Sequence, residues 1–326
     1  MQVASSRSTL VWVLLFGALA LFPWLATVAG QDFYIGVVIR IMIFAIAASS
    51  LNLILGYGGM VSFGHAAFFG LGAYAASIAV VHGADNVWLV WTLAAVVGGL
   101  SAFVVGYVAT RTRGAYFIMI TLAMGQLFYF LFVGLRQYGG DDGLRMQARP
   151  ALGLGLDIGS EPVFYAVVLV WTLLMHLMLA RLVRSRFGLA LEAVRENEQR
   201  MGAVGYSTRQ YRIIAFVVAG VMAGVAGALL AMHNQFVSPK MLHWSQSGTL
   251  MIMVALGGMG RLHGGFLGAA ALLLLEEVLS SYFSYWHIYV GAVLLLVVMV
   301  SPDGLAGLGR TFRRAPAATA DAGRNR

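Results

Sequence analysis

The sequence contains no cysteine and few charged residues, and each shortage excludes a class of protein. Without cysteine the chain has no disulfide bond and no thiolate-bound metal site. Only 10% of its 326 residues are charged, so we expect no nucleic-acid partner despite a formal charge of +8. We also find no nucleophile–base set, no metal-ligand spacing and no phosphate-cradling glycine loop. We therefore expect no catalytic site, no metal and no cofactor in this chain; ATP, if it is used, binds to another subunit.

The chain is rich in apolar residues instead, with 60% hydrophobic residues and a mean hydropathy of +0.83. Runs of about 20 apolar residues match the ~30 Å hydrocarbon core of a bilayer. We predict an all-α, polytopic membrane protein with about ten transmembrane helices, some of them broken at glycine-rich segments. The predicted spans are 10–30, 33–55, 60–82, 87–109, 115–135, 161–181, 212–232, 243–260, 264–283 and 285–301. The first run is long for a signal peptide and lacks a clean cleavage site, so an uncleaved span is favoured.

The basic residues lie mostly in alternate loops, which predicts the orientation of the spans. With the N-terminus in the cytoplasm, 16 of the 21 basic residues share the cytoplasmic side. They are Arg7, Arg111, Arg113, the seven arginines from Arg181 to Arg212, Arg261 and the five arginines from Arg310 to Arg326. The longest loop on the other side, 137–160, contains "YGGDDGLRMQARP" and is expected to be irregular and exposed. We treat 1–309 as one transmembrane domain and 310–326 as a disordered cytoplasmic tail.

One cytoplasmic loop, at about 183–211, concentrates the charge of the chain. Ten of the 34 charged residues (21 basic plus 13 acidic) lie between Arg181 and Arg212. Good helix formers from Phe187 to Gly205 predict one short amphipathic helix. Its apolar stripe would consist of Leu189, Ala193, Val194 and Met201. Two interpretations stay open: the helix lies in the lipid headgroups, or it docks on a cytoplasmic partner. Its glutamates weigh against simple attraction to anionic lipid.

A glycine-rich stretch, "SSLNLILGYGGMVSFGHAAFFGLGAYAAS", interrupts the apolar sequence from 49 to 77. Its "GGM" and "HAAFFG" have a weak echo in "GGM" and "HGGFLG" at 257–268, as two related halves would give. Glycine allows unwound backbone beside a watery cavity, and broken helices form transporter sites. The candidate path or hinge residues are Asn52, Gly56, Gly58, Gly59, Ser62, His65, Gly257 and Gly258. The structural alternative is close helix packing for the glycines, an interhelical hydrogen bond for Asn52, and a hydrogen-bonded His65 near the cytoplasmic interface.

Three charged residues fall inside predicted spans. Arg40 lies near the outer end of the second span and either extends outward or faces a polar partner. Glu276 and Glu277 lie in the ninth span, where a carboxylate is a functional candidate. The alternative is that one of the two glutamates packs against a neighbouring helix and the other extends its side chain to the membrane–water interface. If these glutamates bind protons, the chain could be an ion-coupled carrier or channel.

Seven stretches, in this order along the chain, resemble one family. They are "LNLILGYGGMVSFGHAAFFGLGAYAAS", "TRGAYFIMITLAMGQLFYFL", "GGDDGL", "EAVRENEQRMGAVGYSTRQYR", "AFVVAGVMAGVAGALLA", "ALGGMGRLHGGFLGA" and "SPDGLAGL". Together they cover about residues 40 to 310 and resemble the LivM-type permease subunit of ABC importers for branched-chain amino acids. The residues after "GGDDGL" depart from the small ones expected there.

The resemblance implies a transporter subunit without covalent chemistry in the bacterial cytoplasmic (inner) membrane. Its implied partners are a second, LivH-like permease subunit, two ATPase subunits that bind ATP, and a periplasmic solute-binding protein. The "EAVRENE" segment then corresponds to the coupling helix, which favours docking over lipid seating. The residues implied in coupling are Glu192, Arg195, Glu196, Asn197, Glu198 and Gly205. Similar permeases act on urea, short amides or aromatic acids, so these solutes stay open as alternatives.

Overall fold

Long apolar runs form helices in this chain because hydrocarbon tolerates only a backbone that satisfies its own hydrogen bonds. The computed structural model describes residues 6–28, 30–31, 33–153, 158–283, 285–300 and 304–307. The α-helices are α1 (Ser6–Val28), α2 (Phe33–Asn52), α3 (His65–Val81), α4 (Val87–Ala109), α5 (Ala115–Gly134), α6 (Glu161–Val183), α7 (Arg186–Glu196), α8 (Glu198–Ala203), α9 (Thr208–Asn234), α10 (Trp244–Gly257), α11 (Gly264–Tyr282) and α12 (Trp286–Val300). The predicted disordered tail, 310–326, lies outside the described residues.

Short elements complete the fold. A π-helical turn, η1 (Leu53–Tyr57), continues α2. Three 3₁₀ turns are η2 (Arg136–Tyr138), η3 (Gly140–Asp142) and η4 (Pro239–Leu242), and the two strands are β1 (Leu144–Arg145) and β2 (Phe236–Val237). Strands this short leave the all-α prediction intact.

Six helices in the described part of the chain are long and apolar enough to cross a membrane. They are Phe33–Tyr57, Val87–Ala109, Ala115–Gly134, Glu161–Val183, Thr208–Asn234 and Gly264–Tyr282. The chain is therefore an all-α, polytopic membrane protein, as predicted. The other four predicted spans coincide with α1, α3, α10 and α12, which do not meet the same criterion within the described residues. Ten crossings therefore stay a prediction.

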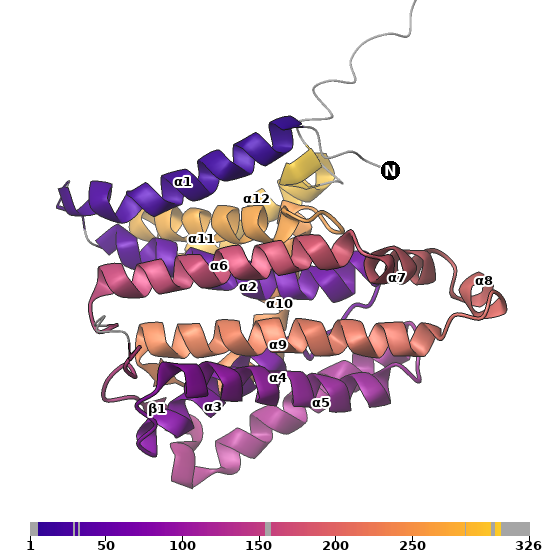
Figure 1. Cartoon of the computed structure of the whole chain (residues 1–326), viewed down its shortest axis with the longest axis horizontal. Helices are drawn as coiled ribbons and strands as arrows, with labels where there is room; N and C mark the ends of the chain where they lie inside the picture. Colours follow the sequence, from indigo (N-terminus) through magenta and orange to yellow (C-terminus); the bar gives the residue numbers. More distant parts are fainter. Residues whose placement is uncertain are drawn as a thin grey trace, which may run out of the picture.

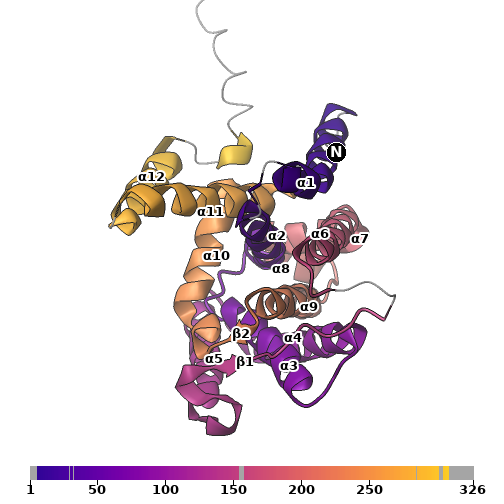
Figure 2. The ribbon, with the colours of Figure 1, turned by 90° about the vertical axis from the view of Figure 1, so that its left-hand side faces the viewer.

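Helix α9 lies at the centre of the bundle, where it packs against α2, α3 and α4 (Figures 1 and 2). Glycine makes these crossings close. A Cβ atom on Gly72 of α3 would lie 2.2 Å from the carbonyl oxygen of Gly224 on α9. One on Gly98 of α4 would lie 2.5 Å from the carbonyl oxygen of Gly220. Because real Cβ atoms do not approach backbone this closely, these positions require glycine for packing.

The loop between α5 and α6 is more ordered than the sequence predicted. Strand β1 pairs antiparallel with β2, so that Leu144 lies opposite Val237. A Cβ atom on Gly143 would lie 2.4 Å from the carbonyl oxygen of Val237, and the φ of Gly143 is +84°. The prediction of an irregular, exposed loop is therefore wrong at β1, because "GGDDGL" turns the chain back onto the bundle.

Arg149 fixes the end of the same loop. Its side chain is only 4% exposed. The guanidinium group donates to the carbonyl oxygens of Met232 (3.0 Å) and Ile158 (3.2 Å) and to Oε1 of Glu161 (2.7 Å). It also lies 4.2 Å from the ring centroid of Phe164. One buried arginine thus ties the loop to both α6 and α9.

Candidate functional site

The charged loop forms two helices at one end of the bundle, with α7 beside the end of α9 and α8 beyond it (Figure 1). Ser185 caps α7, because its hydroxyl accepts from the Gly188 amide at 3.5 Å. At Asn197 the backbone is extended, with φ −154° and ψ 95°, and the Asn197 side chain accepts from the Arg200 amide at 2.9 Å. The prediction of one continuous helix from Phe187 to Gly205 is therefore wrong. Asparagine is a strong N-cap residue, and here it ends α7 and begins α8.

Gly205 makes the turn that leads from α8 toward α9. Its φ of +95° is the left-handed conformation that favours glycine. The amide of Tyr206 donates to the carbonyl oxygen of Met201 at 3.1 Å, which closes the end of α8. Helix α9 then begins at Thr208.

Helix α7 has a buried face and an exposed face, and the predicted apolar stripe divides between them. Leu191 and Val194 are buried, whereas Leu189 is 62% exposed. Of the predicted stripe, Val194 thus packs on the bundle, whereas Leu189 is free to face lipid or a partner. Glu192 and Glu196 are also exposed, and the spacing of these three residues places them near one face of α7. The exposed face thus combines one apolar side chain with two carboxylates.

Arg195 points the other way, into the glycine-rich segment. Its Nη1 donates to the carbonyl oxygen of Gly56 in η1. Gly59 has φ +66°, and a Cβ atom there would lie 2.8 Å from Cγ of Arg195. A hydrogen bond from a charged donor contributes about 1.5–3 kcal/mol. Arg195 therefore holds the charged loop against the broken end of the second span.

Asn52 connects the two glycine-rich segments to each other. Its side chain is buried, donates to the carbonyl oxygen of Arg261 at 2.7 Å and accepts from the Gly260 amide at 3.0 Å. A Cβ atom on Gly56 would lie 2.1 Å from Oδ1 of Asn52 and 2.3 Å from the Gly260 nitrogen. The hydrogen bonds of Asn52 therefore run to the backbone of the α10–α11 turn and not to a second helix. Gly260 was not among the predicted residues, although it follows the second "GGM".

The second segment is a tight turn between α10 and α11. A Cβ atom on Gly257 would lie 1.7 Å from the carbonyl oxygen of Gly264, so Gly257 is a packing position. Gly258 ends α10 with φ +113°. Gly58, its counterpart in the first turn, has ordinary dihedral angles and lies close to the backbone of Ile54.

His65 and Ser62 lie apart from the Arg195 contact. His65 is fully buried at the start of α3, and its Nε2 lies 2.8 Å from Oγ of Ser50 on α2. It is the hydrogen-bonded histidine of the structural alternative. Ser62 is also fully buried, and its Oγ has no hydrogen-bond partner among the described residues. Among the eight candidate path residues, Gly56 and Gly59 lie against Arg195, and Asn52 lies against Gly56. We call this group of contacts the Arg195 junction.

Glu198 pairs with residues of the membrane domain. Its Oε2 lies 2.7 Å from Nη2 of Arg212 on α9 and 3.2 Å from Nε of Arg113 in the α4–α5 loop. Its Oε1 accepts from the Thr208 hydroxyl at 3.2 Å. The side chain is only 16% exposed. Sequence spacing did not identify Arg113 and Arg212 as its partners, because they are distant along the chain.

Two of the three charges within the predicted spans pair with each other. Nη2 of Arg40 on α2 lies 3.6 Å from Oε1 of Glu276 on α11. The side chains are 45% and 27% exposed, respectively. This is the polar partner that the sequence left open for Arg40. The pair with Arg40 explains why a carboxylate, that of Glu276, lies within the membrane domain.

A family model described as "Branched-chain amino acid transport system / permease component" matches residues 33–301. The match covers the glycine-rich segments, the charged loop and the α10–α11 turn. The chain belongs to this family. It is accordingly a permease component of a membrane transport system, and the resemblance found in the sequence is confirmed.

Individual relatives agree with this assignment. The chain is 27% identical over 292 residues to the high-affinity branched-chain amino acid transport system permease protein LivM of Escherichia coli, covering 82% of this chain and 69% of the relative. It is 28% identical to LivH of Salmonella typhimurium, covering 81% of this chain and 91% of the relative. The autoinducer 2 import system permease protein LsrC of Salmonella paratyphi B is 31% identical over half of each chain. No solved structure matches.

Proposed function

We propose that this chain is the LivM-like permease subunit of an ATP-driven importer of branched-chain amino acids in a bacterial cytoplasmic membrane. The proposed solute is the one named for the LivM and LivH relatives, which align over most of this chain. Since both kinds of permease are similar to it, a LivH-like subunit is the proposed second half of the transport path. Two ATPase subunits and a periplasmic binding protein would complete the importer.

The proposed mechanism rests on the hydrogen bond from Arg195 of α7 to the carbonyl oxygen of Gly56 in η1. Helix α7 extends from the bundle, and its exposed face presents Leu189, Glu192 and Glu196. An apolar side chain flanked by charges suits docking in a groove of an ATPase subunit better than seating in anionic lipid. The opposite face of α7 holds Gly56 through Arg195.

Movement of a docked α7 would therefore be passed directly to the transport domain. Arg195 would carry it to η1, and Asn52 would carry it from η1 to the α10–α11 turn. The ion pairs of Glu198 with Arg113 and Arg212 would move α8 together with α4, α5 and α9. Closure of the ATPase pair could in this way change which end of the path is open, while this chain itself makes and breaks no covalent bond.

The test is uptake of radiolabelled leucine, isoleucine and valine into vesicles that contain this chain and its partners. We expect uptake that requires ATP, the ATPase subunits and the binding protein. Urea, short amides and aromatic acids serve as competing solutes. Uptake without the ATPase subunits, driven by a proton gradient, would instead support a carrier.

A further inference from the structure

Two arginine side chains lie against one tyrosine ring at the α7–α8 end of the bundle. Cζ of Arg111 is 4.7 Å from the ring centroid of Tyr107, and Cζ of Arg209 is 4.6 Å from it. Arg209 also donates from Nη2 to the backbone oxygen of Tyr107 at 2.9 Å. Tyr107 is 44% exposed and lies in the last turn of α4, where tyrosine occupies the membrane–water interface.

The charges of these two arginines lack an acidic partner in the described part of the chain. Glu198 of α8, at the same end, pairs with Arg113 and Arg212 instead. Nε of Arg209 is buried and has no hydrogen-bond partner among the described residues. Two positive groups beside one ring repel each other, so an anion that bridges them would be stabilising. Guanidinium groups bind phosphate through paired hydrogen bonds.

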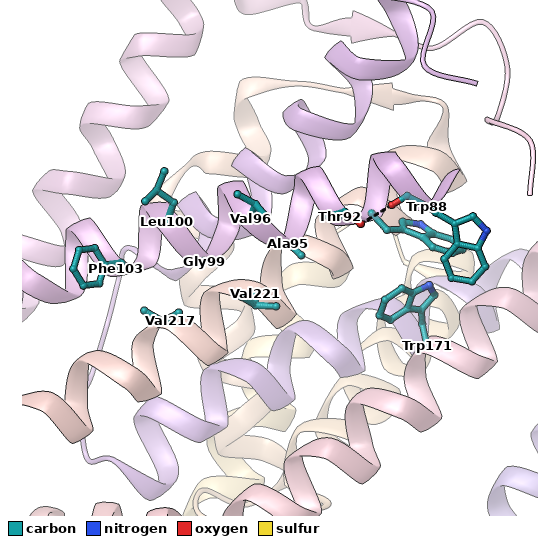
Figure 3. A pocket seen from close by; sticks show the side chains of 11 residues that line it. Trp88, Thr92, Ala95, Val96, Gly99, Leu100, Phe103, Trp171, Val217 and Val221 are labelled. Carbon is teal, nitrogen blue, oxygen red and sulfur yellow. Dashed lines mark hydrogen bonds between the residues drawn. The ribbon is translucent and has the colours of Figure 1, made fainter. Parts of the chain in front are cut away.

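An apolar groove begins one helical turn away from this pair. The ring of Phe103 stacks on that of Tyr107, with 6.2 Å between centroids, and also lines the groove. The groove has a volume of about 560 Å³. Its lining includes Val96, Gly99, Leu100 and Phe103 of α4 and Val217 and Val221 of α9. Figure 3 shows Gly99 between Leu100 and Val96 on α4, with Val217 and Val221 on α9 beside them.

Gly99 leaves the groove open at this level. A Cβ atom there would lie 2.8 Å from Cγ2 of Val221, so a larger residue would occupy the space between the two helices. Val96 and Leu100 are 57% and 61% exposed, as expected of side chains that face lipid. An apolar groove on this wall of a membrane protein is filled by hydrocarbon rather than by water.

We propose that Arg111, Arg209 and the groove over Gly99 form a binding site for one anionic phospholipid. The phosphate lies between the two guanidinium groups, and one acyl chain follows the groove between α4 and α9. From Tyr107 to Gly99, α4 advances by about 12 Å. That length fits within the roughly 15 Å of one leaflet, half of a ~30 Å core. The headgroup site and the groove are thus at the spacing that one lipid molecule requires.

The test is native mass spectrometry of the full-length chain, purified in detergent with equal amounts of phosphatidylglycerol and phosphatidylcholine. The native chain should retain phosphatidylglycerol preferentially. The double variant Arg111→Gln/Arg209→Gln should reduce that preference by roughly tenfold or more, since each basic residue contributes to anionic-lipid attraction. The matched control, Arg136→Gln/Arg145→Gln, removes two charges from the opposite end and should retain the native preference.

Gly99→Leu tests the acyl-chain part of the site separately, once gel filtration has shown that the variant is folded. It should release phosphatidylglycerol at lower collision energy while its preference over phosphatidylcholine persists. The proposal is wrong if the native chain shows no preference, if the control loses as much as the double variant, or if Gly99→Leu retains lipid like the native chain. Loss of a co-purified permease subunit with unchanged lipid retention would make this face a subunit interface and would also overturn the proposal.

Discussion

The guanidinium group of Arg195 on α7 donates a hydrogen bond to the carbonyl oxygen of Gly56, 139 residues earlier in the chain. Gly56 lies in the π-helical turn that ends the second span, directly against Gly260 of the α10–α11 turn. One side chain of the charged loop thus contacts the point where two broken membrane segments meet. In the proposed importer, this contact would couple ATPase movement to the transport path.

Replacing Arg195 with Gln should impair coupling without preventing docking. The charge-assisted hydrogen bond to Gly56 would weaken by about 1.5–3 kcal/mol, which corresponds to a roughly ten- to hundredfold loss in a coupled step. We expect solute uptake in vesicles to fall at least tenfold while the ATPase subunit still co-purifies. The control is Arg200→Gln, which removes an exposed arginine from α8. Equal loss of uptake in both variants would contradict a specific role for Arg195.

Gly56→Ala should destabilise the junction by overpacking. The new methyl group would lie 2.1 Å from Oδ1 of Asn52 and 2.3 Å from the Gly260 nitrogen, which is backbone and cannot rotate away. Overpacking of this kind typically costs about 1–3 kcal/mol. We expect thermal unfolding in detergent to begin several degrees lower. Gly202→Ala on α8, where a Cβ atom meets nothing within 4 Å, should leave the unfolding temperature unchanged or raise it.

Much of the fold could be predicted because apolar length alone identifies membrane helices. The ten predicted ranges all coincide with helices, although six meet the criterion for crossing a membrane within the described residues. The split at Asn197 was missed because helix propensity is summed over a window, whereas a cap acts at one residue. The preference of asparagine for the N-cap position could have revealed the break between α7 and α8.

The contacts of the site were harder to predict because they join distant residues. Spacing placed Glu192, Arg195 and Glu198 on one charged helix, but it could not show that Arg195 and Glu198 bind the membrane domain. The apolar pattern also could not show that Leu191 and Val194 pack on the bundle while Leu189 stays exposed. The roles of these residues in coupling stay predictions.

Removing the Arg149 side chain should loosen the loop between α5 and α6. Arg149→Met would leave three acceptor groups, on Met232, Ile158 and Glu161, without their charged donor. We expect about 3 kcal/mol of destabilisation and faster protease cleavage between residues 135 and 160. Arg145→Met removes an exposed arginine from the same loop and should change neither. Similar cleavage rates in both variants would contradict the anchoring role.

Replacing both membrane glutamates should separate the importer from a proton-coupled carrier. Glu276 forms an ion pair with Arg40 at 3.6 Å, so we assign it to helix packing rather than to proton transfer. Glu276→Gln/Glu277→Gln should retain ATP-dependent uptake at a moderately reduced rate, and a protonophore should have no direct effect. Complete loss of uptake with normal assembly would support coupling through these carboxylates.

We propose that the exposed face of α7 docks on an ATPase subunit, and a charge reversal at Glu196 tests this docking most directly. Glu196→Lys reverses one exposed charge without touching the Arg195–Gly56 contact. Co-purification of the ATPase subunit and solute uptake should be measured on the same vesicles. We expect the variant to lose both the bound ATPase subunit and solute uptake. If the ATPase subunit stays bound and uptake continues, α7 is an interfacial helix and the proposed docking is wrong.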